Sequence, residues 1–378
     1  MKTAEQKTRS ILTAATCGAI LLTTATAHAG TWTYSAAPDP RITHSGGGWT
    51  LSVAEPADKD LSVTGVITPK AGQRGPSSLP LGDAVTGGYR IVAIIGEGAI
   101  CKYESLKSIT LPASLTTIGQ FAFATCTGLT SVTIPPGVTH IRVGAFSECE
   151  SLKSVTLPAS VTTIGTGAFT GCKSLTSITL PASLTDIGGG VFYQCEALAS
   201  VTIPAGVTSI GEGAFFYCTG LKSVILPTSL TSIGKEAFRN CASLPAITLP
   251  ASVTAIGDGA FYDCANLKGF TVAEANPAYR GIGGVLFSKD GTRLVLYPAG
   301  RGGKYDIPAR VTEIGNFAFA GTGLTGVTIP PGVTTIGVGA FSVCARLKSV
   351  TLPASVTEIG ENAFPEDTRV VRPSAQKK

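Results

Sequence analysis

The stretch LKSVTLPASVTTIGTGAFTGCKS, residues 152–174, decides the fold because its pattern recurs along most of the chain. The following stretch, LTSITLPASLTDIGGGVFYQCEA at 175–197, keeps the same apolar, proline, glycine, phenylalanine and cysteine positions. A fixed period in this range indicates an array of stacked units rather than a globule with one central core. Similar units begin at further leucines: Leu106, Leu129, Leu198, Leu221, Leu244, Leu324 and Leu347.

Phenylalanine and cysteine mark the repeat most clearly, because each returns at intervals of 23 residues. Every cysteine takes the same place in its unit, whereas a disulfide needs its own Cβ geometry. We therefore expect buried free thiols that pack as small apolar groups, with bridges between adjacent units as the alternative. The predicted core columns comprise Phe123, Cys126, Phe146, Cys149, Phe169, Cys172, Phe192, Cys195, Phe215, Cys218, Phe238, Cys241, Phe261 and Cys264.

Each unit contains two short extended segments and a bend. LKSVTLP at 152–158 is rich in β-branched residues and alternates, which predicts a strand that ends at Pro158. VTTIG at 161–165 predicts a second strand, and GAFTGC at 167–172 predicts a tight bend or a single helical turn. Burial of about six apolar side chains gives roughly 10–15 kcal/mol. Ordering the backbone costs about 1–2 kcal/mol per residue. A lone unit is therefore unstable, and stacking is required.

The run SLKSVTLPASVTTIGTGAFTGC at 151–172 resembles the leucine-rich repeat of bacterial BspA-like surface proteins. The unit length, the proline after the strand, and the Ile-Gly, Ala-Phe and Cys positions match, and the resemblance covers about residues 83–369. It implies an α/β-type repeat: a right-handed leucine-rich-repeat solenoid with parallel β-strands and short helical turns. It also implies exposure at the cell surface or outside, and a role in adhesion or binding. No cofactor is expected.

The first 29 residues are typical of a secretory signal peptide, because a basic start precedes a short apolar run, Ile11 to Leu22, and an Ala-His-Ala cleavage site. The apolar run is shorter than the about 20 residues that a membrane span needs, and no second one follows. We therefore expect a secreted or cell-surface protein, with a periplasmic location as a possibility. The signal carries three basic residues and one acidic residue, so its removal lowers the net charge from +5 to +3. The remaining lysines are scattered, which argues against nucleic-acid binding.

The non-repeating residues 30–82 predict a small β-rich cap over the first unit, since arrays need a covered end. Residues 370–378 predict a disordered basic tail. Between 267 and 310 the repeat is interrupted by GVLFS and TRLVLYP, joined through Lys289-Asp290-Gly291, which predicts a hairpin insertion. The insertion is either a structural addition at the rim or a protruding edge that binds a partner. Its candidate contacts are Tyr279, Phe287, Arg293 and Tyr297.

Aligned serines and threonines follow the first strand of successive units. They can reflect simple β-propensity on a wet face, or a polar platform for proteins or glycans on a cell or host surface. Ice binding is a weaker alternative, because lysines and Ile225 interrupt the regular hydroxyl pattern. The candidate binding face consists of Ser131, Thr133, Ser154, Thr156, Ser177, Thr179, Ser200 and Thr202.

Catalytic motifs are missing from the sequence. Beyond the signal only His44 and His140 are histidines, and neither lies in a recognisable triad pattern. No Cys-x-x-Cys pair supplies zinc ligands. We therefore predict an exported scaffold for adhesion or for protein or glycan interaction, without catalysis. The alternatives are a passive structural envelope protein without a specific ligand and a small hydrolase-like activity in the N-terminal region.

Overall fold

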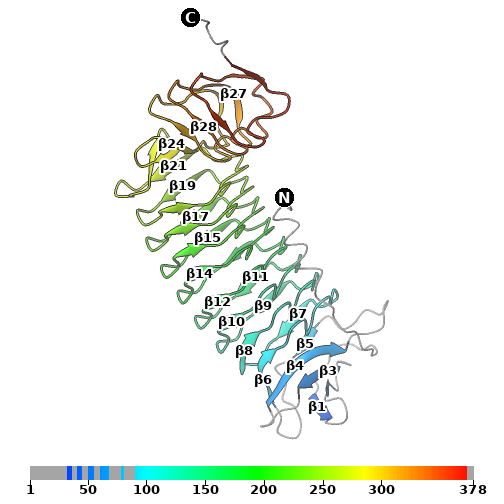
Figure 1. The fold of residues 1–378 in the computed structure, drawn as a ribbon. Helices are drawn as coiled ribbons and strands as arrows, with labels where there is room; N and C mark the ends of the chain where they lie inside the picture. Colours follow the sequence, from blue (N-terminus) through cyan, green and yellow to red (C-terminus); the bar gives the residue numbers. More distant parts are fainter. Residues whose placement is uncertain are drawn as a thin grey trace, which may run out of the picture. The chain divides into compact units, whose positions relative to one another are not determined.

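A computed structural model describes residues 95–372 in full, together with the backbone of six earlier strands. The predicted signal peptide at 1–29 and residues 373–378 of the predicted tail lie outside the described residues. The chain divides into two compact units, Met1–Leu198 (unit 1) and Ala199–Lys378 (unit 2). Each unit is built from stacked coils, or rungs, and each rung contributes one short strand to each of two walls (Figure 1).

Unit 1 contains two walls of parallel strands. In its first wall β9, β11 and β13 pair in register, so Ser154 lies between Ser131 and Ser177. In its second wall β6, β8, β10 and β12 pair in sequence. The strands of unit 1 are β1 Trp32–Ser35, β2 Arg41–His44, β3 Thr50–Ala54, β4 Asp60–Ile67, β5 Ser78–Pro80, β6 Arg90–Ile95, β7 Ser108–Thr110, β8 Leu115–Ile118, β9 Ser131–Thr133, β10 His140–Ile141, β11 Ser154–Thr156, β12 Thr163–Ile164, β13 Ser177–Ile178 and β14 Asp186–Ile187.

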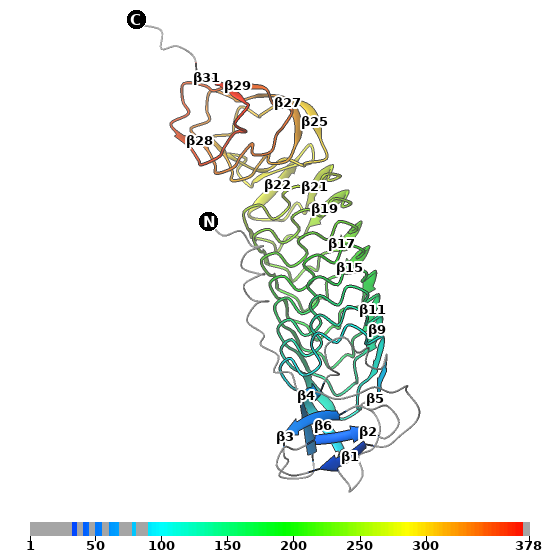
Figure 2. The same ribbon diagram turned by 90° about the vertical axis from the view of Figure 1, so that its right-hand side faces the viewer.

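The first four strands of unit 1 differ from the rungs, because β1, β2, β3 and β4 pair antiparallel to one another. Strand β4 then pairs parallel to β6, so this meander continues directly into the second wall (Figure 2). The sheet edge of the first rung is thereby covered by hydrogen-bonded strands. An uncovered edge of this kind would be open to pairing with other chains.

Unit 2 repeats the two-wall arrangement. Its first wall contains the pairs β15–β17, β19–β21, β25–β27 and β29–β31, and its second wall contains β16–β18–β20 and β24–β26–β28–β30. The strands of unit 2 are β15 Ser200–Thr202, β16 Ser209–Ile210, β17 Ser223–Ile225, β18 Ser232–Ile233, β19 Ala246–Leu249, β20 Ala255–Ile256, β21 Gly269–Val272, β22 Tyr279–Ile282, β23 Val285–Ser288, β24 Arg293–Leu296, β25 Gly302–Asp306, β26 Glu313–Ile314, β27 Gly323–Thr328, β28 Thr335–Ile336, β29 Ser349–Thr351, β30 Glu358–Ile359 and β31 Arg369–Val371.

The core of each unit is a set of columns that run between the walls. Phe146 stacks on Phe123 at 5.1 Å and on Phe169 at 5.5 Å between ring centroids, with the rings nearly parallel. In unit 2 Phe238 lies in the same way between Phe215 and Phe261, at 5.1 and 5.3 Å. All fourteen phenylalanine and cysteine side chains of the predicted core columns are buried. Identical side chains thus remove one another from water, rung after rung.

The eight cysteines of the column, including Cys344, are free and buried, which confirms the expectation of free thiols at these positions. Seven of these thiols donate to a backbone carbonyl of a preceding rung; for example, Cys149 Sγ donates to the carbonyl of Phe123 at 3.1 Å, and Cys172 Sγ donates to that of Phe146 at 3.2 Å. Desolvation raises the pKa of the Cys126 and Cys264 thiols to about 12. Cysteine therefore serves as a small apolar group with one weak donor.

The bend before each cysteine is not helical, so the expectation of short helical turns is wrong for the described residues, which contain only strands, turns and bends. Gly167 and Gly171 have φ angles of 63° and 71°, in the left-handed region that interrupts a right-handed helix. Between them the N–H of Thr170 closes a local turn on Gly167, at 3.0 Å, whereas the N–H of Phe169 bonds to Val191 of the next rung, at 2.9 Å. Every second backbone N–H of the bend thus donates a hydrogen bond to the next rung, and these bonds would be lost if the bend were helical.

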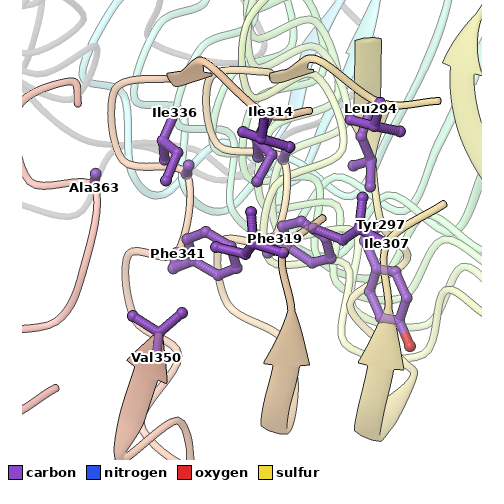
Figure 3. Packing of buried hydrophobic residues seen from close by; sticks show 14 of the residues in the cluster. Leu294, Tyr297, Ile307, Ile314, Phe319, Ile336, Phe341, Val350 and Ala363 are labelled. Carbon is purple, nitrogen blue, oxygen red and sulfur yellow. The ribbon is translucent and has the colours of Figure 1, made fainter. Parts of the chain in front are cut away.

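The predicted hairpin is present, since β23 and β24 pair antiparallel around residues 289–291, with β22 added beside β23. Strand β24 also belongs to the second wall, because Leu294 pairs with Ile314. The Tyr297 N–H donates to Ala318 at 2.7 Å, which is the bond that a column phenylalanine makes in other rungs. Leu294, Ile314 and Ile336 form one file and Tyr297, Phe319 and Phe341 another (Figure 3). The interruption is therefore an expanded rung.

Candidate functional site: the hydroxyl face of the first wall

The first wall of each unit presents a grid of hydroxyl groups to solvent. In β9 and β11 the central Val132 and Val155 are buried, whereas the residues on either side are exposed. Successive residues of a strand point to opposite faces, so a Ser-x-Thr strand directs both hydroxyls outward. All eight residues of the predicted binding face are exposed: Ser131, Thr133, Ser154, Thr156, Ser177 and Thr179 in unit 1, and Ser200 and Thr202 in unit 2.

These eight hydroxyls are not used by the fold. Within the described residues no hydrogen bond engages any of their side-chain oxygens. The strand register places like beside like, so Thr156 lies next to Thr133 and Ser154 next to Ser131. Adjacent parallel strands lie about 4.8 Å apart. The grid therefore offers donors and acceptors at a fixed spacing, and their only partners are water or a ligand.

A second set of threonines, the second-wall file, has the opposite role. Thr162 Oγ1 donates to the carbonyl of Thr139 at 3.2 Å, and Thr139 Oγ1 donates to that of Thr116 at 3.4 Å. In unit 2 Thr231 Oγ1 makes the same bond to Thr208 at 2.9 Å. These hydroxyls reinforce the contact between successive rungs. We therefore restrict the candidate site to the first wall.

Two of the four hairpin candidates lie in the core. Phe287 is 0% exposed and Tyr297 is 4% exposed, so neither side chain is presented to a partner, which corrects the expectation for these two. Tyr279 is half-buried, and its hydroxyl accepts the N–H of Ile256 at 3.1 Å.

Arg293 is the fourth hairpin candidate. Its Nε lies 3.0 Å from a carboxylate oxygen of Glu313 on the neighbouring strand, an ion pair of two half-exposed groups. The pairing of β24 with β26 places these two residues side by side. The hairpin candidates therefore serve mainly to build the expanded rung.

Asn276 is a structural residue that the sequence interpretation missed. Its side chain is fully buried, and its Nδ2 donates to the carbonyls of Pro250 and Val253, both at 2.9 Å. Its Oδ1 accepts the N–H groups of Ala278 and Tyr279, at 2.9 and 2.8 Å. This side chain thus fastens the inserted chain to the preceding rung. The Asn-Pro pair at 276–277 was the available signal, because this dipeptide marks a turn.

Metal-binding groupings are absent from the part of the chain that the structure describes in full. No three His, Cys, Asp or Glu side chains gather there as a metal site. His140 is exposed, and its Nδ1 lies 2.7 Å from Thr139 Oγ1, whereas the side chain of His44 is outside the described residues. The same part of the chain contains no apolar helix long enough to cross a bilayer.

Comparisons with known proteins agree with this architecture. The BspA type Leucine rich repeat region matches in six copies, over residues 93–219, 185–290 and 303–373. A leucine rich cell surface protein from Faecalibacterium prausnitzii is 26% identical, with a TM-score of 0.56 over 87% of this chain and 94% of its own. A leucine-rich repeat protein from Bacteroides ovatus is 24% identical, with a TM-score of 0.55 over 86% and 98%. None of the curated proteins matches.

Proposed function

Because the chain belongs to the family of the BspA type leucine rich repeat region, we propose that it is an exported, non-catalytic scaffold that binds protein or glycan ligands at or outside the cell surface. Proteins built from leucine-rich repeats mediate protein binding. The Faecalibacterium neighbour, a leucine rich cell surface protein, supports a surface location. The leader-like sequence at 1–29 supports export.

The exposed grid of unengaged hydroxyls carries the proposal. Hydrogen bonds between rungs hold the backbone of the strand-lined wall in place, so its groups stay at a fixed spacing and less entropy is lost on binding. In the second wall the backbone already uses the hydroxyls, for example that of Thr162. In the first wall Thr133 and Thr156 keep both donor and acceptor capacity. The first wall is therefore the part of each unit best equipped to recognise a polar ligand.

A matched pair of variants tests this proposal. The double variant Thr133→Val, Thr156→Val removes two hydroxyls from the first wall while it keeps the branched shape. The control Thr139→Val, Thr162→Val makes the same change in the same two repeat units, but in the second wall. We expect the first variant to weaken binding to a ligand found on a protein and glycan array by about tenfold or more, a loss of about 1.4 kcal/mol.

The control variant should keep its affinity but lose about 1–3 kcal/mol of stability, because it removes two inter-rung hydrogen bonds. Isothermal titration and chemical unfolding measure the two effects. If both variants bind as the parent does, the first wall is not the binding face. If no array component binds the parent chain, the alternative of a passive structural envelope protein is favoured instead.

A further inference from the structure

The first wall also has a distinctive charge. Its strands and the residues that directly precede them, from position 107 to 271, contain four lysines, Lys107, Lys153, Lys222 and Lys268, and no aspartate or glutamate. All four lysines are exposed. The whole chain has almost as many acidic as basic residues, 24 against 29. Between positions 107 and 271 this face therefore carries only positive charge, whereas β25, further along the wall, includes Asp306.

The two lysines of each unit are separated by the same number of rungs. In unit 1 the Lys107 carbonyl accepts the N–H of Thr130, and the Thr130 carbonyl accepts the N–H of Lys153. The two lysines are thus two rungs apart, which corresponds to about 9.6 Å at the usual strand spacing. In unit 2 the spacing in sequence is the same, with Pro245 in the rung between Lys222 and Lys268.

Three of these ammonium groups, those of Lys107, Lys153 and Lys222, have no protein partner within the described residues. The carboxylate of Glu150, three residues before Lys153, is bonded instead by Lys173 at 2.7 Å. Lys268 is held through its Nζ, which donates to the Gly300 carbonyl at 3.1 Å. Lys107 and Lys153 in unit 1 and Lys222 in unit 2 are therefore available to an anion.

We propose that the first wall binds an acidic polysaccharide that runs across the strands. This inference rests on the proposed function and names its ligand class. An extended sugar residue is about as long as one rung is high, so a polymer with a carboxylate on every second sugar places its charges near successive lysines. Sugar hydroxyls both donate and accept hydrogen bonds, as do the serine and threonine hydroxyls between the lysines.

The surface suits a sugar polymer better than an acidic peptide. A peptide strand binds by adding to a free sheet edge, where it gains main-chain hydrogen bonds. Along this face the main-chain groups bond from rung to rung, as in the pairing of β9, β11 and β13. Only side chains are presented. A ligand that bonds through many hydroxyls and a few carboxylates complements this surface.

Binding to hyaluronan, which has a carboxylate on alternate sugars, tests the proposal when it is compared with carboxyl-reduced hyaluronan of the same length. We expect the parent chain to bind hyaluronan at least tenfold more tightly than the reduced polymer. The affinity should fall as salt rises from about 0.05 to 0.5 M, because exposed charges are screened. Equal binding of both polymers overturns the inference but leaves the proposed glycan-binding function intact.

Charge reversal supplies the matched control. The variant Lys153→Glu, Lys222→Glu should reduce hyaluronan affinity by about tenfold or more. The variant Lys235→Glu, Lys289→Glu makes the same change in net charge at two exposed lysines outside the first wall, and should change affinity less than twofold. Equal losses in the two variants would show a dependence on net charge alone and reject the site. If the parent chain binds only an acidic peptide, and Thr133→Val, Thr156→Val weakens that binding, the polysaccharide is not the ligand. The first wall would then still be the binding face.

Discussion

The two hydroxyl-bearing walls of each unit have similar composition but different roles. In the second wall, from β8 onward, a threonine precedes the last two strand residues of each regular rung. The expanded rung supplies Thr292, whose carbonyl accepts Thr312 Oγ1. In the first wall the corresponding position is threonine in most rungs, but it is Pro80 in β5, Ile225 in β17, Asp306 in β25 and Val371 in β31. A hydroxyl that bonds the neighbouring rung is kept in most rungs, whereas one that faces solvent is replaced by an apolar or charged residue in some. Variation within the repeat thus distinguishes an available surface from a structural one.

The largest expected effect comes from the column that separates the walls. Phe169 is buried and stacks on Phe146 at 5.5 Å and on Phe192 at 5.8 Å. Phe169→Ala should lower the free energy of unfolding by about 3–5 kcal/mol, because it opens a cavity between two rungs. Urea unfolding followed by circular dichroism measures the loss. The exposed control Thr163→Ala should stay within about 0.5 kcal/mol. A loss below 1 kcal/mol for Phe169→Ala would mean that the walls do not depend on this stack.

The thiols of the same core predict an alkaline loss of stability. Burial raises the pKa of Cys126 and Cys264 from 9.0 to about 12. Between these values the unfolded chain releases protons that the folded chain retains, so the contribution is complete below pH 9 and is lost as pH rises toward 12. We expect each thiol to lower the free energy of unfolding by up to about 1.4 kcal/mol per pH unit in this window. Urea titrations at pH 8, 9, 10 and 11 measure the slope.

Removal of the two thiols provides the control for this slope. Cys126→Ala, Cys264→Ala should show a shallower fall between pH 9 and 11 than the parent chain, although its stability at pH 8 is lower. An unchanged slope would show that these thiols do not remain protonated inside the folded unit. In the parent chain the column thiols should also resist alkylation at pH 8, because the thiolate is the reactive form.

The bend between the two walls contains residues other than glycine with a positive φ angle. Val343 is 63% exposed and has a φ of 57°, a conformation that is costly for a β-branched residue. Val343→Gly should stabilise unit 2 by about 1 kcal/mol, because the left-handed conformation costs an L-residue roughly 1–2 kcal/mol. The exposed control Val338→Gly, outside the residues with positive φ, should destabilise by about 0.5–1 kcal/mol. Thermal unfolding distinguishes the two signs.

Much of this architecture can be predicted from the sequence because one short repeat recurs many times along the chain. The period predicts the stack, and the recurrence of Phe and Cys predicts the buried columns, since only an identical environment selects identical residues. The backbone conformation of the bend is not determined by the sequence in the same way. GAFTGC is compatible with a helical turn, and only the hydrogen bonds to the next rung exclude it. The insertion was misread in part for a similar reason. Tyr297 follows no repeat in the sequence, yet it takes the place of a column phenylalanine.

The smallest predicted effect compares the two walls directly. Thr231 belongs to the second wall, where its Oγ1 donates to Thr208 at 2.9 Å, whereas Ile225 interrupts the hydroxyl grid of the first wall and is 59% exposed. Thr231→Val should cost about 0.5–1.5 kcal/mol of stability without a change in ligand affinity. Ile225→Thr should change stability by less than about 0.5 kcal/mol. It should strengthen ligand binding by unit 2, because it restores a hydroxyl beside Thr202. Calorimetry of the two variants measures both quantities, and an affinity change in Thr231→Val but not in Ile225→Thr would reverse the assignment of the walls.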